Sequence, residues 1–435
     1  MSPAWHCAVC GQLERGLPAR RRPGPTAGRV TPSRRTTVQH PVEAIYLDHA
    51  ASSPQRPEVT EAMARVAGLP GNPSATHAFG RRVRALVEEA REEVAELLGA
   101  EPAELLFTAG GTEADNLAVI GGYRALPRGA GVVTTRTEHA AVTEAVGRLV
   151  QAEGAELGWA EVDAGGLVPP AALAGVLDAW GSGGGAGPDA GTRPALVSIV
   201  WGNSETGVLQ DVPALAEVVR AHGGVLHVDA VQVVGHAPVD VAASGVHLLS
   251  MAAHKVGGPQ GVGLLVARRG VGLRPVNHGG GQERRIRSGT VPVALVVGLA
   301  AALRAALADG AAEQARLRGL QERFEAQLAA VAAARVTGAG SPRLPHVSHV
   351  TFAGCRSQDL LFLLDDAGVA ASGGSACAAG TSQPSATLAA MGRGADEAAS
   401  GIRFSWGWST TVEEVDRAAA ALPGVVERAR VAGQV

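Results

Sequence analysis

Short apolar runs alternate with helical patterns through the middle of the chain, and this alternation is the strongest constraint on its fold. The apolar runs are predicted strands and cover residues 105–108, 132–135, 196–201, 225–228, 248–251 and 264–267. The helical patterns between or beside them cover residues 113–122, 140–151 and 212–221. Strands that alternate with helices favour parallel pairing, so the sequence predicts an α/β fold with a mostly parallel sheet and helices on both faces.

The segments on either side of this region have different patterns. Residues 80–98 place apolar side chains on one helical face and end at Gly99, which predicts an amphipathic helix with a glycine stop. After about residue 305, a long Ala-, Leu- and Arg-rich helix is expected over roughly 306–334. An apolar run at 346–352, a helix at 357–367, a Gly/Ser/Cys loop and a C-terminal helix follow it. This order predicts a second, smaller α+β domain.

Two segments have no regular hydrophobic period. Residues 1–44 are rich in Arg and Pro and are predicted to form a disordered arm, and the Gly-rich stretch at 181–194 is predicted to be a flexible surface insertion. Cys7 and Cys10 resemble half of a zinc knuckle. No second Cys or His pair lies near them at metal-binding spacing, so no metal site is expected.

Composition excludes several other classes of protein. The net charge of −3 argues against a dedicated nucleic-acid binder. The longest apolar run, 291–303, is shorter than the roughly 20 residues that a bilayer span needs. The arm lacks the charged-then-apolar layout of a secretory signal, and four cysteines are too few for a disulfide scaffold. We therefore expect a cytoplasmic protein that contacts neither membranes nor nucleic acid.

Lys255 is the only lysine in the chain, because the other 37 of the 38 basic residues are arginines. Arginine can replace lysine wherever a positive charge is sufficient. It cannot lose its proton and attack a carbonyl, however, as a lysine amine can. The single lysine therefore indicates covalent amine chemistry, with chance retention as the alternative.

Polar clusters follow five of the predicted strands. They are the turn at 109–113, which opens a helix, His139, Asn203, Asp229 with Gln232, and the His254–Lys255 pair. Each alone has an ordinary explanation, such as a turn, a surface histidine or a helix cap. Ligands of open α/β sheets lie beyond the carboxyl ends of strands, so these clusters are expected to converge there. Together they match the needs of pyridoxal phosphate: an amine for its aldehyde, a carboxylate for its ring nitrogen and a helix N-terminus for its phosphate.

At this point the sequence resembles the cysteine desulfurases, which are pyridoxal-phosphate enzymes of the aminotransferase class V superfamily, and specifically those that serve iron–sulfur cluster or nitrogenase assembly. The resemblance runs from Tyr46 to about Asp416. Its motifs are YLDHA at 46–50, GNPSATH at 71–77, FTAGGTEADN at 107–116, TEH at 137–139, NSETG at 203–207, HVDAVQ at 227–232, HK at 254–255, RSGT at 287–290, SAC at 375–377 and IRFS at 402–405.

The resemblance implies a role for each matching residue. Lys255 would hold the cofactor as a Schiff base and move the substrate's α-proton, Asp229 would pair with the ring nitrogen, and His139 would stack on the ring. Asn203 and Gln232 would bond the side of the ring that carries the phenolic oxygen, and Asn203 would also face the substrate. The phosphate would be held by Gly111, Thr112, His254 and, from a partner subunit, Thr290. Arg403 would clamp the substrate carboxylate, a task that suits its planar pair of donors.

Cys377 lies in a run of small residues, SGGSACAAGTSQP at 372–384. A structural cysteine is usually found in an apolar run, whereas a thiol on a Gly/Ser loop suits a nucleophile that must move. The resemblance makes Cys377 the persulfide carrier, and Cys355 has no counterpart in the family pattern. One departure from that pattern is Ala252, where the family usually has a serine whose hydroxyl bonds the phosphate.

The expected fold is therefore that of the fold-type-I pyridoxal-phosphate transferases. Residues 60–305 would form a large domain around a mostly parallel seven-stranded sheet, and residues 306–435 a small domain joined by residues 45–59. The expected reaction converts L-cysteine to L-alanine in a homodimer and passes the sulfur to an acceptor protein. The alternatives are a selenocysteine lyase, another β-eliminating lyase on the same fold, or an inactive interaction protein that retains the fold.

Overall fold

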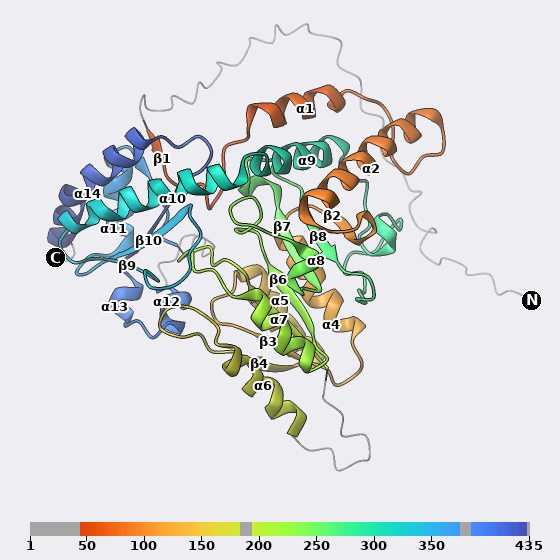
Figure 1. Ribbon diagram of the computed structural model, residues 1–435, viewed down its shortest axis with the longest axis horizontal. Helices are drawn as coiled ribbons and strands as arrows, with labels where there is room; N and C mark the ends of the chain where they lie inside the picture. The colour runs from red at the N-terminus through yellow and green to blue at the C-terminus, as the bar shows by residue number, and fades with distance from the viewer. Residues whose placement is uncertain (1–43, 183–193, 375–383, 433–435) are drawn as a thin grey trace, which may run out of the picture. The chain divides into compact units, whose positions relative to one another are not determined.

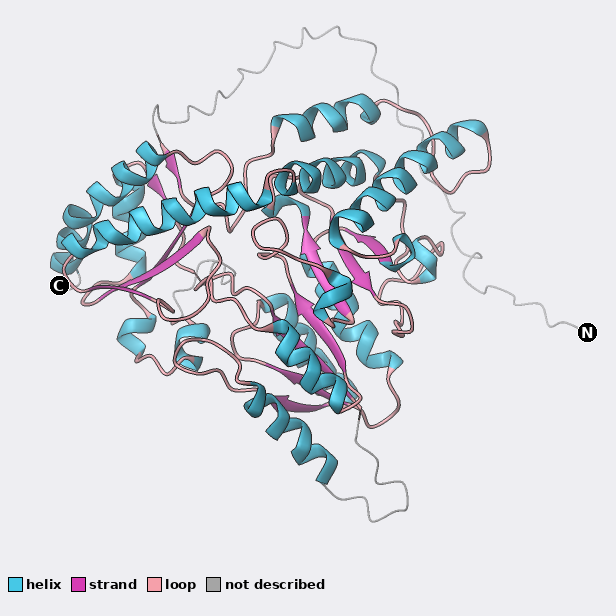
Figure 2. Cartoon of the chain, in the orientation of Figure 1, coloured by secondary structure: helices cyan, strands magenta, loops and turns pink. Residues whose placement is uncertain are grey.

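A seven-stranded sheet is built from the alternating apolar runs (Figures 1 and 2). The computed structural model describes residues 44–182, 194–374 and 384–432. The strand order is β2-β8-β7-β6-β5-β3-β4, and neighbouring strands are parallel except where β8 pairs with β2 and β7. The strands are β2 (Leu105–Thr108), β3 (Gly131–Thr134), β4 (Glu156–Trp159), β5 (Ala195–Val200), β6 (Val225–Asp229), β7 (Leu248–Ala252) and β8 (Gly263–Ala267). The predicted mostly parallel α/β sheet is confirmed.

Helices cover both faces of this sheet, because successive strand residues point to opposite sides. On β7, Leu249 and Met251 pack on one face while Leu248 packs on the other. The first face is covered by α1 (Pro57–Ala67), α2 (Ala78–Leu98), α6 (Pro170–Ser182), α7 (Val212–Ala221), α8 (Val241–Ser244) and α9 (Val293–Leu307). The second face is covered by α5 (Ala140–Glu153) and by the run of α3 (Gly111–Asn116), a π turn (Leu117–Gly121) and α4 (Gly122–Ala125).

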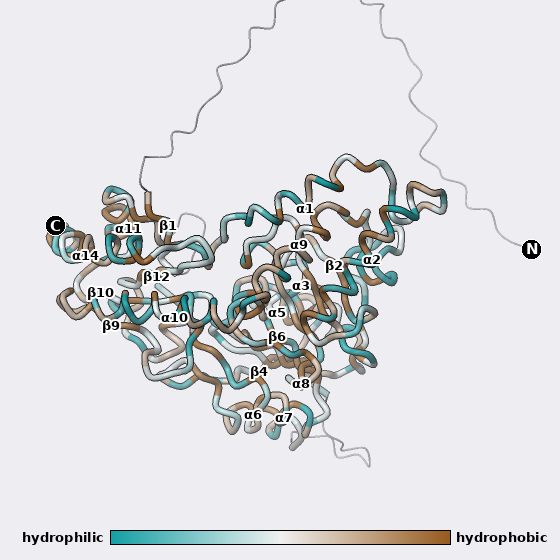
Figure 3. Tube along the Cα trace, turned by 45° about the horizontal axis from the view of Figure 1, so that its top comes forward, coloured by the Kyte–Doolittle hydropathy of each residue, from teal (hydrophilic) through white to brown (hydrophobic). Residues whose placement is uncertain are grey.

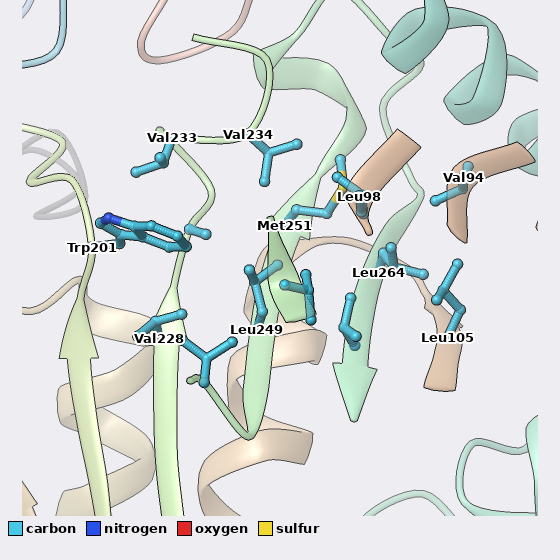
Figure 4. Packing of buried hydrophobic residues seen from close by; sticks show 14 of the residues in the cluster. Val94, Leu98, Leu105, Trp201, Val228, Val233, Val234, Leu249, Met251 and Leu264 are labelled. Atoms are coloured by element: carbon cyan, nitrogen blue, oxygen red, sulfur yellow. The ribbon is translucent and has the colours of Figure 1, made fainter. Parts of the chain in front are cut away.

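The helix predicted to stop at Gly99 does so. Helix α2 ends at Leu98, and Gly99 takes a left-handed backbone with φ of 66°. Figure 4 shows Val94 and Leu98 of this helix packed beside Leu105, Met251 and Leu264 of the sheet.

Leu264→Ala should destabilise the protein strongly, because Leu264 on β8 is fully buried in this cluster. Removing a buried leucine side chain costs about 2–5 kcal/mol of the free energy of unfolding. Phe362→Ala is the control, because 73% of Phe362 is exposed. Equal denaturation midpoints for the two variants would contradict this prediction.

A second hydrophobic core lies in the C-terminal part and includes Phe324, Phe352, Phe404 and Trp406. Its antiparallel sheet has the order β12-β10-β9, made by β9 (Ala334–Val336), β10 (Val347–Phe352) and β12 (Gly401–Ser405). The helices that contribute to this core are α10 (Gly310–Gln327), α11 (Ser357–Asp366) and α14 (Val412–Ala432), while α12 (Ala386–Ala390) and α13 (Ala395–Ala398) belong to a separate small cluster. The C-terminal part therefore combines helices with an antiparallel sheet, as an α+β arrangement requires. The domain boundaries given above remain predictions.

The N-terminal segment joins this second core. Strand β1 (Ile45–Tyr46) pairs in parallel with β11 (Val369–Ala370), and Asp48 bridges to Ser405. Segment 48–53 then continues to the end of β7, where the N–H of Ser53 donates to the carbonyl of His254 over 2.9 Å.

The helix predicted over roughly 306–334 is present but shorter than predicted. Helix α9 ends at Leu307, Asp309 has a non-helical backbone, and α10 runs only to Gln327 before strand β9. The two helices also differ in hydropathy (Figure 3), because α9 is largely buried whereas α10 presents a charged outer face.

The predicted arm at 1–44 and most of the predicted insertion at 181–194 lie outside the described residues.

In the part of the chain that is described, no single helix is long and apolar enough to span a membrane. Only α9 followed by residues 310–330, bent by 73°, passes that test as a pair.

Candidate active site

Five loops converge at one edge of the seven-stranded sheet, because β2, β3, β5, β6 and β7 all end there. The residues predicted from the strand ends follow these strands directly. Asp229 is the last residue of β6, and His254 and Lys255 form a 3₁₀ turn after β7. The convergence expected from the sequence is therefore present.

Asp229 lies at the centre of this edge and is 5% exposed. Its Oδ1 accepts the N–H of Val231 over 2.9 Å. Burial raises the pKa of Asp229, while the nearby charges of His139 and Lys255 oppose that rise. Asp229 thus interacts electrostatically with both His139 and Lys255. The protonated ring nitrogen of a bound cofactor would add a further positive charge, which favours the carboxylate form of Asp229.

The amine of Lys255 reaches across to the N-terminal segment. Its Nζ donates to the carbonyl oxygens of Ala50 and Ala51 over 2.8 and 2.9 Å. The single lysine is thereby fixed at the end of β7, beside the Asp229 carboxylate.

The turn before α3 forms one wall of a cavity of about 820 Å³. Its lining includes Gly110, Gly111, Thr112, Ser52 and His254. Gly111 leaves little room for a side chain, because a Cβ there would lie 2.9 Å from the Cγ2 methyl of Val231. The N-cap residue Gly110 offers no side-chain cap, so the first N–H groups of α3 remain available to an anion.

Glu113 ties this turn to a distant loop. Its carboxylate accepts the backbone N–H of Ala109 and pairs with Arg287, whose Nε lies 2.8 Å from Oε1. These contacts lower the pKa of Glu113 despite its partial burial. The turn is therefore joined to the loop around Arg287 by an ion pair.

Two amide side chains are oriented toward the same edge by their partners. Asn203 Nδ2 donates to Thr137 O over 2.9 Å, and its Oδ1 accepts N–H groups of Glu205 and Thr206. Gln232 Nε2 donates to Ala50 O over 2.8 Å, and its Oε1 lies 3.2 Å from Nε2 of His346. Among the described residues, one N–H of each amide is left for a ligand.

Arg403 on β12 is 3% exposed and already paired. Its Nη2 donates to Oδ1 of Asp48 over 2.8 Å, and its Nη1 donates to Ser204 O over 2.9 Å. Its Nε is buried with no hydrogen-bond partner in the described part of the chain. A buried donor without a partner is costly, so this guanidinium is prepared for one more acceptor.

Of the predicted residues that the structure describes, Gly111, Thr112 and His254 line this cavity. Thr290 is exposed on the loop after Arg287 and does not line the cavity. Cys377 lies outside the described residues, between Gly374 and Pro384. The backbone of Ser372, just before that segment, pairs with Arg403. Cys355, by contrast, is buried with its Sγ 3.7 Å from Val426 O, and burial raises its pKa.

The sequence analysis missed a set of buried groups beneath the site. Glu138 is half-buried, its Oε2 atom is buried with no partner among the described residues, and desolvation raises its pKa to about 8. Asp115 is similar, with its pKa raised by burial and by Asp229. Both lie inside motifs quoted above, so their position next to His139 and in the helix after the glycine turn was the available signal.

Comparison with known proteins gives a consistent assignment. The sequence profile of the family "Aminotransferase class-V" matches residues 45–418. An IscS-like cysteine desulfurase of Mycobacterium tuberculosis is 46% identical over 392 residues, which cover 88% of this chain and 97% of the relative. The solved structure of a NifS-like protein from Rickettsia africae covers 88% of this chain and 100% of its own, with 27% identity and a TM-score of 0.79. A structure described as SspA in complex with cysteine covers 83% of this chain and 98% of its own, with 29% identity and a TM-score of 0.69.

The fold and the edge-of-sheet site define an enzyme of the fold-type-I, aminotransferase class V kind. The extent of the match to named desulfurases narrows this class further. The chain belongs to the cysteine desulfurase family.

Proposed function

We propose that this cysteine desulfurase uses pyridoxal phosphate to convert L-cysteine to L-alanine, with Cys377 as the sulfur carrier. The observation that carries the proposal is the placement of the only lysine, Lys255, beside the buried carboxylate of Asp229 at the sheet edge that also holds the glycine turn. This donor set fits the cofactor: an amine, a carboxylate, two amide N–H groups and an uncapped helix start.

Each group would have a defined task toward the cofactor. Lys255 would hold it covalently, Asp229 would face its ring nitrogen, and His139 would lie against its ring. Gly111, Thr112 and His254 would hold the phosphate, while Asn203 and Gln232 would donate to the phenolic oxygen. When bound, the cofactor supplies an electron sink for the carbon that carries the substrate amine.

The remaining tasks fall to residues of the chain. Arg403 would bind the substrate carboxylate, and Lys255 would take the proton from the substrate α-carbon. The thiolate of Cys377 would attack the substrate sulfur, so that an S–S bond forms as the C–S bond breaks. A proton delivered to the β-carbon would complete alanine, leaving a persulfide on Cys377.

We further propose a homodimer in which the partner's copy of the 287–290 loop supplies its threonine to the phosphate, since Thr290 is exposed here. The persulfide would pass to an acceptor protein of iron–sulfur cluster assembly or thiolation, in the cytoplasm. Neither nucleic acid nor a membrane is expected as a partner.

The test is an assay of the purified protein with L-cysteine. Alanine should appear, and intact-mass measurement should find one added sulfur atom on the peptide containing Cys377. Faster turnover of selenocysteine or cystine would favour the lyase alternatives. A protein that stays colourless after pyridoxal phosphate is added would favour the inactive alternative.

Asp48→Asn should lower the KM for cysteine. Asp48 and the substrate carboxylate would share the guanidinium of Arg403, and the repulsion between these two like charges, screened because the Asp48 side chain is 22% exposed, would weaken substrate binding by about 1 kcal/mol. Asparagine keeps the oxygen that holds Nη2 but removes the charge, so KM should fall by roughly three- to tenfold.

Asp48→Ala is the matched control for this prediction. It removes the oxygen as well as the charge, so Arg403 loses its hold and KM should rise. An unchanged or raised KM in Asp48→Asn would show that the charge of Asp48 does not oppose substrate binding.

A further inference from the structure

The hydroxyl of Ser52 lies at the cavity wall formed by the glycine turn and His254. The segment that carries it is anchored on both sides: the N–H of Ser52 donates to Asp48 O over 3.3 Å, and that of Ser53 donates to His254 O over 2.9 Å. Ser52 therefore faces the cavity from a fixed backbone.

Position 252 faces the same turn but lacks a hydroxyl. A Cβ placed on Gly111 would lie 3.5 Å from the Cβ of Ala252, so side chains at this position point to the turn. Ser250, two residues earlier, cannot take its place. The Oγ of Ser250 lies 2.9 Å from Nε2 of His227, and Ser250 is fully buried.

Ser52 is in contact with His254 at this wall. Its Oγ lies 3.2 Å from Nδ1 of His254. Burial and the charge of Lys255 lower the pKa of His254 to about 4, so the ring carries a single proton near neutral pH. Its Nε2 has no hydrogen-bond partner among the residues that the structure describes.

The position of that single proton decides whether His254 attracts or repels an anion. If it lies on Nδ1, Nε2 presents a lone pair to a phosphate, which is repulsive. If Ser52 donates its own proton to Nδ1, the ring proton must lie on Nε2 and can be donated to the phosphate.

We propose that Ser52 is a positioning residue for the cofactor phosphate: its hydroxyl donates to Nδ1 of His254 and keeps the ring proton on Nε2, facing the anion. The inference rests on the proposed function, because it requires the cavity to hold a phosphorylated cofactor. It also explains how the site holds a phosphate although Ala252 provides no hydroxyl.

The experiment compares the binding of two probes, pyridoxal phosphate and pyridoxal, to the full-length protein freed of cofactor by dialysis. The readout is the dissociation constant from fluorescence titration. Ser52→Ala should bind pyridoxal phosphate about tenfold more weakly and bind pyridoxal as the parent does, because only the phosphate uses His254. Ser52→Thr retains the hydroxyl and should bind both probes as the parent does.

Two further variants complete the design. Ser53→Ala is the matched control, because the Oγ of Ser53 contacts Nδ1 of His49, 2.9 Å away, rather than His254. It should bind both probes as the parent does. Ala252→Ser in the Ser52→Ala background should recover most of the lost affinity, since it supplies a direct donor at the same turn.

The proposal is overturned if Ser52→Ala binds pyridoxal phosphate as tightly as the parent, or if it loses equal affinity for both probes. Ser52→Thr binding as weakly as Ser52→Ala would also overturn it. A parent that binds neither probe would instead contradict the proposed function, so the two failures are distinguishable.

Discussion

Lys255→Arg is expected to abolish desulfurase activity while leaving the fold intact. A guanidinium keeps the positive charge and can still donate to the carbonyls of Ala50 and Ala51, but it can neither hold the cofactor covalently nor accept the α-proton. Loss of proton transfer alone costs roughly 10²–10⁴-fold in rate, and loss of covalent attachment adds to this. The measurement is alanine formation from cysteine, with circular dichroism as the check on folding.

The single lysine makes a chemical control unusually clear. Borohydride reduction of the parent should fix the cofactor on one peptide, the one that contains Lys255, because the chain has no other lysine. The Lys255→Arg variant then contains none and should remain unlabelled. Label found mainly on the N-terminal amine of the parent would contradict the assignment.

Cys377→Ser is expected to eliminate persulfide formation without affecting cofactor binding. A serine hydroxyl is a far weaker nucleophile than a thiolate at neutral pH and cannot form an S–S bond. The variant should bind pyridoxal phosphate with the parent's affinity and still change its visible spectrum when cysteine is added, yet release no sulfide in the presence of a reductant.

Cys355→Ser is the matched control, because Cys355 is buried in the second core and its environment raises the thiol pKa. It should retain nearly all of the parent's activity. Substantial sulfide release by Cys377→Ser would mean that another thiol carries the sulfur.

The part of the site that was predictable is the part built from strand ends. Each of the strands β2, β3, β5, β6 and β7 is a short, mostly apolar and almost fully buried run, so its end and the polar residue there could be located from the sequence. Strand β4 was missed for the opposite physical reason. It is an outermost strand of the sheet, and its residues, Glu156–Trp159, are only partly buried, so they show no apolar run.

Contacts between distant segments could not be predicted in this way. Asp48 and Arg403 are 355 residues apart, and nothing in the sequence around either residue indicates that their side chains form an ion pair. The same holds for Ser52 and His254, which are 202 residues apart. The start of α10 was predicted to within a few residues, whereas its end was predicted too late because helix-forming residues, mostly Ala, continue past Gln327 to Ala334.

The pairing of the N-terminal segment with the last strands has a consequence for biosynthesis. Residues 45–53 dock against β11 and Ser405, so the Asp48–Arg403 pair forms only after almost the whole chain has left the ribosome. The cofactor residues from Gly111 to Lys255 are translated well before that point. The arginine proposed to bind cysteine is therefore translated last of these residues, so an unfinished polypeptide lacks the group that would hold the substrate.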